Sequence, residues 1–91
     1  MPTICRFDEI SIKMNKEGGA QHKRPHVHAY YKETSASFDI ETGEVLASED
    51  FPNEQRKAVA DWIAQERAEL MREWDTLTAG GEWFTINKPG K

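Results

Sequence analysis

The sequence predicts an α+β fold, in which a small antiparallel sheet of about five strands is followed by a long C-terminal helix or helix pair. Two observations support this prediction. Short segments with period-two alternation fill the first half of the chain, and one long segment with helical periodicity fills the second. The 91 residues suffice for one domain, which we place at residues 1–86, with a flexible tail at 87–91.

The first two strands are expected at residues 3–7 and 10–15. In the second of these, isoleucine and methionine alternate with serine and lysine, as in a strand with one buried side. Asp8 and Glu9 lie between the two segments and predict a tight turn or a bulge.

A loop of about ten residues at 16–25 contains two adjacent glycines and ends in proline, which stops any helix before the next strand. The third and fourth strands are expected at residues 26–31 and 35–40. A turn at Gly43 then leads into a short fifth strand.

Residues 51–81 predict the helix. Pro52 suits its start and Gly80–Gly81 its end. Large apolar side chains recur at spacings of three, four and seven residues and so share one helix face: Val59, Ile63, Leu70, Trp74 and Leu77. An unbroken helix of about 26 residues would be about 39 Å long. Because that is long for so small a domain, we expect a break near residues 65–67. Residues 82–86 are compatible with a last short strand.

Composition excludes several classes of protein. No apolar run is long enough to span a bilayer, and the first residues lack the apolar region of a signal peptide, so the cytoplasm is the expected compartment. Cys5 is the single cysteine, which excludes a disulfide framework and a four-cysteine zinc site. We expect it to be a small buried strand residue.

The charge is unevenly distributed. Residues 1–32 hold six basic and three acidic side chains, a net charge of +3, whereas residues 33–91 hold six basic and thirteen acidic ones, a net charge of −7. The acidic total of −4 argues against general coating of nucleic acid. The basic rim beside the histidines is compatible with an anionic ligand.

All three histidines lie in the segment HKRPHVHAYY at residues 22–31. Strand geometry places His26, His28 and Tyr30 on one face of the sheet and the alternating residues on the core side. Matching the inward-facing residues of the next strand predicts that Ala29 lies opposite Phe38. In this register His28 faces Asp39, Tyr30 faces Ser37 and His26 lies near Glu41.

A His–Asp pair near a second histidine suggests acid–base chemistry. His28 would act as the base, Asp39 would orient its ring, and His26 would act as the acid. Lys23 and Arg24 would bind a phosphate, and Tyr30 would line the substrate site. Such an arrangement could cleave a phosphodiester such as RNA without any cofactor.

Two other interpretations stay open. His22, His26 and His28 could bind Zn or a similar divalent metal, with Asp39 as a fourth ligand or as a partner of a ligand, although their spacing matches no zinc motif. Alternatively, the histidine face is a plain polar surface or a partner-binding face. Trp62 and Trp74 are then expected in the core or in an interface.

The segments MPTICRFDEISIKM, H-x-x-P-H-V-H-A and FDIETGEVL, together with the tryptophan-bearing helix, resemble the short bacterial proteins of domain-of-unknown-function family 4160 over about residues 1–86. The loop of that family usually reads H-x-P-P-H-F-H-A. Here Arg24 replaces the first proline and Val27 the phenylalanine, which makes the loop less rigid and more basic.

The resemblance implies no established activity. Members of this family resemble toxin–antitoxin modules in being tiny and often encoded beside another small protein, which implies a protein partner and an RNA or DNA target. The leading hypothesis is therefore a component of a toxin–antitoxin-like module with a histidine-rich functional face, and if it is the toxin, RNA cleavage is the first reaction to test. The alternatives are a non-catalytic module that binds a partner or a second copy of itself through its tryptophan-bearing helix, and a small metal-binding protein.

Overall fold

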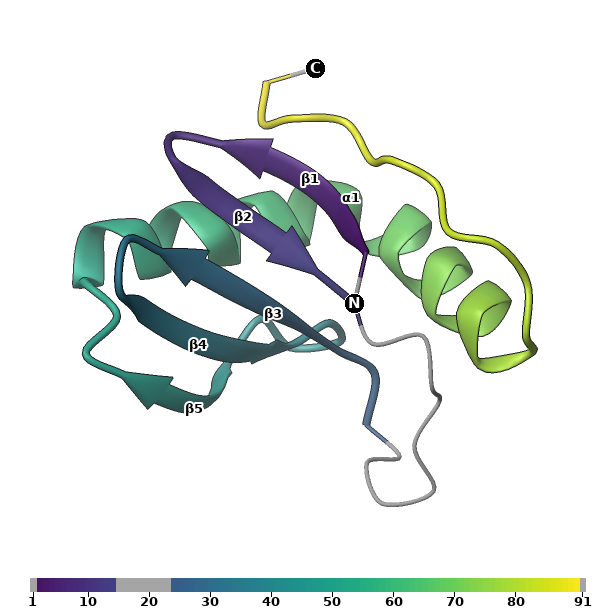
Figure 1. The fold of residues 1–91 in the computed structure, drawn as a ribbon, viewed down its shortest axis with the longest axis horizontal. Helices are drawn as coiled ribbons and strands as arrows, with labels where there is room; N and C mark the ends of the chain where they lie inside the picture. The colour runs from purple at the N-terminus through teal and green to yellow at the C-terminus, as the bar shows by residue number, and fades with distance from the viewer. Residues whose placement is uncertain (1, 15–23, 91) are drawn as a thin grey trace.

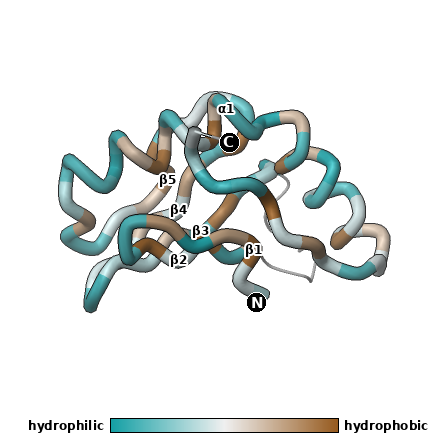
Figure 2. Tube along the Cα trace, turned by 90° about the horizontal axis from the view of Figure 1, so that it is seen from above, coloured by the Kyte–Doolittle hydropathy of each residue, from teal (hydrophilic) through white to brown (hydrophobic). Residues whose placement is uncertain are grey.

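In the computed structural model, which describes residues 2–14 and 24–90, a five-stranded sheet is followed by one long helix (Figure 1). The strands are β1 (Thr3–Phe7), β2 (Ile10–Lys13), β3 (His26–Tyr31), β4 (Thr34–Asp39) and β5 (Val45–Glu49). They lie in sequence order and every neighbouring pair is antiparallel. Helix α1 (Asn53–Thr78) covers one side of the sheet, so helix and sheet form two layers (Figure 2). The predicted α+β class and strand number are confirmed.

Two-residue turns join β1 to β2 and β3 to β4. Asp8 and Glu9 both have positive φ angles, 48° and 64°, and connect the paired residues Phe7 and Ile10. Turns of this hand match the twist of the strands that they join. Lys32, with φ of 54°, begins the corresponding turn between β3 and β4.

The core lies between the sheet and α1. Its sheet side consists of the apolar residues that alternate inward, including Ile10, Ile12, Val27, Ala29 and Phe38, all of which are fully buried. The predicted apolar helix face is also buried, and Trp62 packs against Phe7 with ring centroids 5.6 Å apart. Burial of these groups is the main driving force for folding. Cys5 is buried in this core, as expected.

Helix α1 is kinked where a break was expected. Glu66 has φ of −109° and ψ of 22°, which are not helical values. Just after the kink, Arg67 Nε donates a hydrogen bond of 2.9 Å to the carbonyl oxygen of Ile40. The second half of the helix is therefore tied to the end of β4. Among the described residues, no helix is both long and apolar enough to cross a membrane.

The segment after the helix runs along β1 (Figure 1). The predicted strand at residues 82–86 is wrong, because no regular structure forms there. One backbone hydrogen bond, from Ile86 N–H to the Ile4 carbonyl, links the segment to β1, and one such bond does not make a ladder. The flexible tail at 87–91 stays a prediction. Trp62 Nε1 donates to the Asn87 carbonyl at 2.7 Å.

Candidate functional site

The side of the sheet opposite α1 is covered by no described helix or strand (Figures 1 and 2). We refer to it as the open face. Because directly paired residues of antiparallel strands point to the same side, the register identifies its members. Two rows cross it, with one residue from each strand: Arg6, Ser11, Tyr30, Ser35 and Glu49 form the first, and Thr3, Lys13, His28, Ser37 and Ala47 form the second.

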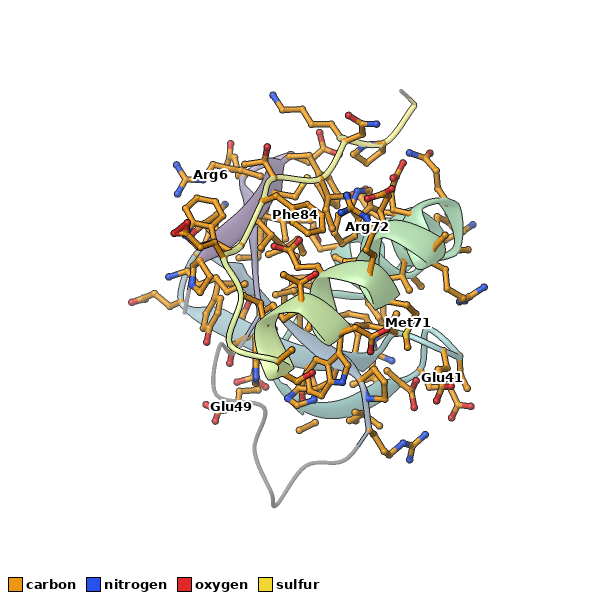
Figure 3. All side chains as sticks on the ribbon, turned by 90° about the vertical axis from the view of Figure 1, so that its right-hand side faces the viewer. Arg6, Glu41, Glu49, Met71, Arg72 and Phe84 are labelled. Carbon is orange, nitrogen blue, oxygen red and sulfur yellow. The ribbon has the colours of Figure 1, made fainter. Side chains whose placement is uncertain are left out.

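The open face combines an aromatic ring, cations and small hydroxyl groups. Tyr30 is half-buried, and Lys13 Nζ lies 5.2 Å from the centroid of its ring, within the range of a cation–π contact. Arg6 lies one strand beyond β2 and is exposed. Arg6 and Glu49 both point to the side away from the helix (Figure 3). The face is therefore basic at the β1 end and acidic at the β5 end.

A pocket of about 210 Å³ lies on the open face between β3 and β5. Its floor is low because the central side chains are serines and alanines. The residues that line it are His28, Tyr30, Ser35, Ala36, Ser37, Ala47, Ser48 and Glu49. Neither Glu49 nor the serines were predicted as site residues. The alternation within each strand places Ser35, Ser37 and Glu49 on this face, but only the register shows that they adjoin His28 and Tyr30.

His26 lies at the boundary between the open face and the core. It is 8% exposed, and its ring packs against the rings of His28 and Trp74 with centroids 5.1 and 5.2 Å away. Its Nδ1 lies 2.8 Å from the carbonyl oxygen of Arg24. A carbonyl can only accept, so Nδ1 carries the proton and Nε2 is the basic nitrogen of the neutral ring.

Asp39 is the last residue of β4 and its side chain contacts the β4–β5 connection. Its side chain is 1% exposed, and Oδ1 accepts hydrogen bonds from the backbone N–H groups of Glu41 and Thr42 at 2.7 and 3.2 Å. Oδ2 forms an ion pair with Arg24. Burial alone would raise the pKa of Asp39, but the backbone donors and the guanidinium together lower it. The carboxylate is therefore ionised at neutral pH.

The predicted register between β3 and β4 is wrong by two residues. Val27 lies opposite Phe38 and Ala29 opposite Ala36, because the turn is centred between Lys32 and Glu33, one residue earlier than the prediction requires. A shift of two residues keeps every side chain on its predicted face, but it changes the pairs.

The partners on the open face change accordingly. His26 faces Asp39, whereas His28 faces Ser37 and Tyr30 faces Ser35. Asp39 therefore does not lie directly opposite His28, and its oxygens are engaged by Arg24 and by the turn. This geometry does not support a role for Asp39 in orienting His28.

The structure describes only part of the predicted phosphate and metal sites. Arg24 pairs with Asp39 and its side chain is 63% exposed. Lys23 and His22 lie outside the described residues, so the trio His22, His26 and His28 stays a prediction. Within residues 2–14 and 24–90, no group of three or more His, Cys, Asp or Glu side chains is arranged to hold a metal ion.

The tryptophans divide between core and surface. Trp62 and Trp74 are buried within the chain, so neither is available to contact a partner from the helix surface. Trp83, in the segment after the helix, is 47% exposed. The expected core position of Trp62 and Trp74 is confirmed, and partner binding by the helix that bears them stays a prediction.

Comparison with known proteins identifies one family. The family model described as "Domain of unknown function (DUF4160)" matches residues 10–75. No curated protein and no solved structure matches the chain. The matched residues include four of the five strands and most of α1, and hence the centre of the open face.

Proposed function

The chain belongs to the DUF4160 family of domains of unknown function, and from the geometry of its sheet we propose that it binds single-stranded RNA on the open face. It would do so as one component of a two-protein module of the toxin–antitoxin type. The module assignment rests on the resemblance described above, and the partner would be a second small protein. The RNA assignment rests on the open face itself.

The observation that carries the RNA proposal is the combination of Tyr30 with Lys13 and Arg6 on an uncovered sheet. Proteins that bind single strands stack bases on aromatic side chains and neutralise the backbone with nearby cations. Tyr30 supplies the ring, Lys13 lies 5.2 Å from its centroid, and Arg6 extends the basic end of the same face. The serines between the strands leave room for a base and offer hydroxyl groups.

RNA cleavage is a second proposal, favoured by the contact between the two described histidines. Their ring centroids are 5.1 Å apart, and the Arg24 carbonyl holds His26 in one tautomer. His28, which is half-exposed, would act as the base, and His26, once protonated at Nε2, would act as the acid. Arg24 would bind the phosphate. Asp39 would then act by holding Arg24 in place.

Binding can be measured by fluorescence anisotropy with a short labelled single-stranded RNA. We expect Tyr30→Ala to weaken binding about tenfold or more, because stacking of one base on an aromatic ring contributes about 1–3 kcal/mol. Lys13→Glu should weaken it similarly. Lys57→Glu, on the exposed surface of α1, makes the same charge change away from the open face and should have little effect. Equal effects of the two lysine changes would contradict the proposal.

Cleavage is tested by incubating the same RNA with the protein and separating the products by size. We expect His28→Ala to abolish cleavage while the anisotropy still reports binding and circular dichroism reports an intact fold. No cleavage by the wild type would leave a binding protein, and cleavage that persists in His28→Ala would exclude the catalytic role of His28.

A further inference from the structure

The first row of the open face changes from positive to negative charge between its two ends. It starts with a cation on β1, Arg6, and ends with a carboxylate on β5, Glu49. Tyr30 lies between them on the central strand. Neighbouring strands are about 4.8 Å apart, so Tyr30 and Glu49, two strands apart, are separated by about 10 Å at the backbone. Ser35 is the small residue between them.

This spacing creates a pocket with unlike walls. Tyr30 and His28 form the β3 wall, Glu49 stands at the β5 end, and Ser35 and Ser37 form the floor. Lys13 lies over the Tyr30 ring, and the pocket extends from Tyr30 toward β4 and β5, so the cations and the carboxylate are on opposite sides of the aromatic wall. A planar ligand packed beside Tyr30 would have an anionic group near Lys13 and a hydrogen-bonding edge near Glu49.

The chemistry of Glu49 selects among the four bases. An ionised carboxylate has two acceptor oxygens and no donor. Guanine alone presents two adjacent donors on its Watson–Crick edge, N1–H and N2–H. Adenine and cytosine place an acceptor beside their donor, and uracil places its single donor between two acceptors. Opposite a carboxylate, those acceptors repel.

We propose that this pocket, named here the Glu49 pocket, binds a guanine base of single-stranded RNA. The base packs beside Tyr30 and His28 above the serines, and N1–H and N2–H donate to the Glu49 carboxylate. The phosphates lie toward Lys13 and Arg6. The inference rests on the proposed RNA-binding function and specifies which base the open face selects.

The test compares oligouridylates that differ at one central nucleotide, which is uridine, adenosine, cytidine, guanosine or inosine. We expect the guanosine oligonucleotide to bind about tenfold more tightly than the others, since only guanine can make a bidentate contact with the carboxylate. Inosine keeps N1–H but lacks the N2 amino group, so its advantage should be much smaller than that of guanosine.

Two variants test whether the Glu49 carboxylate itself recognises guanine. Glu49→Gln replaces one acceptor with a donor and should abolish the preference for guanosine. Glu54→Gln removes an equal charge from the exposed first turn of α1 and should leave the preference unchanged. The comparison of the two separates specific recognition from a general gain in affinity on loss of a negative charge.

The outcomes distinguish the two proposals. No binding of any of these oligonucleotides overturns the RNA-binding function and with it the Glu49 pocket. Binding without preference for guanosine, or a preference that survives Glu49→Gln, overturns the Glu49 pocket and leaves RNA binding in place.

Discussion

Asp39 illustrates how the role of a residue depends on its contacts. In the sequence it is an acid close to histidines, which suggests catalysis. In the fold, Oδ1 accepts hydrogen bonds from two backbone N–H groups of the β4–β5 turn, and Oδ2 forms an ion pair with Arg24. A buried carboxylate is tolerated only when its oxygens have such partners. Its main effect is thus to hold the turn and to fix Arg24 beside the open face.

We predict that Asp39→Asn destabilises the protein by about 1–3 kcal/mol at neutral pH, because it removes the charge that the guanidinium and backbone donors stabilise. The pKa of Asp39 is lowered in the folded state, so this stability is present above the ordinary aspartate pKa. It is lost as the pH falls through the folded-state value. Urea unfolding across this pH range should show the two proteins converge in acid.

The matched control is Asp61→Asn, at an exposed position of α1. It should change the unfolding free energy little at any pH. A difference between Asp39→Asn and wild type that stays constant down to strongly acidic pH would show that the ion pair does not contribute as described.

At the scale of elements, the segment after α1 covers the edge strand β1. Exposed edges invite pairing with other chains, and folds commonly cover them. Phe84 is held in two ways: its N–H donates to Glu73 Oε2 at 2.8 Å, and Arg72 lies over its ring, with Cζ 4.1 Å from the centroid (Figure 3). Helix and segment therefore depend on each other.

Glu73 is the least satisfied group in this contact. It is fully buried, and its Oε1 has no hydrogen-bond partner among the described residues. Burial raises the pKa of Glu73, and the Phe84 N–H and Arg72 offset this only in part. Ionising the folded protein at this position therefore costs stability as the pH rises above the ordinary glutamate pKa.

We predict that Glu73→Gln removes the loss of folding stability that accompanies ionisation of Glu73 at rising pH. The unfolding free energy of the variant, relative to wild type, should rise as the pH increases above the ordinary glutamate pKa, since glutamine has no proton to lose. Thermal unfolding at a series of pH values measures this change. Glu82→Gln, an exposed acid of the same segment, should run parallel to wild type, and the same parallel course for Glu73→Gln would refute the prediction.

At the scale of the molecule, the basic end of the open face contrasts with the acidic charge of the chain as a whole. The chain carries a net charge of −4, yet Arg6 and Lys13 lie together at the β1 end of the open face. The acidic remainder opposes nonspecific binding of nucleic acid. The proposed RNA complex should therefore depend on a few local contacts rather than on overall charge.

We predict a shallow salt dependence for that complex. Each phosphate neutralised on a single strand contributes about −0.7 to the slope of log K against log salt, so two cations give about −1.4. Arg6→Gln should reduce the slope to about −0.7. Anisotropy titrations over a series of salt concentrations measure both values. A slope several times steeper would place the RNA on a more basic surface than the open face.

Much of the fold could be predicted because it follows from patterns that are local in the sequence, namely alternation in the strands and helical spacing in α1. Alternation in the strands separates covered from open residues, as at Val27 and His28, and this separation survives even a register error of two residues. Helical spacing identifies the buried face of α1, and its length predicts the break at Glu66. The candidate site was predicted in part, through His26, His28 and Tyr30, because these share one strand.

The sequence by itself determined which residues lie on each face of the sheet and where the five strands and the helix fall, although not that residues 82–86 form no strand, because these properties repeat along the chain. Only the tertiary structure decided which residues meet across strands. The turn at Lys32 places Asp39 opposite His26, and the β4–β5 pairing brings Glu49 into the row of Tyr30. Such contacts join residues far apart in sequence, and a shift of one turn residue changes all of them at once.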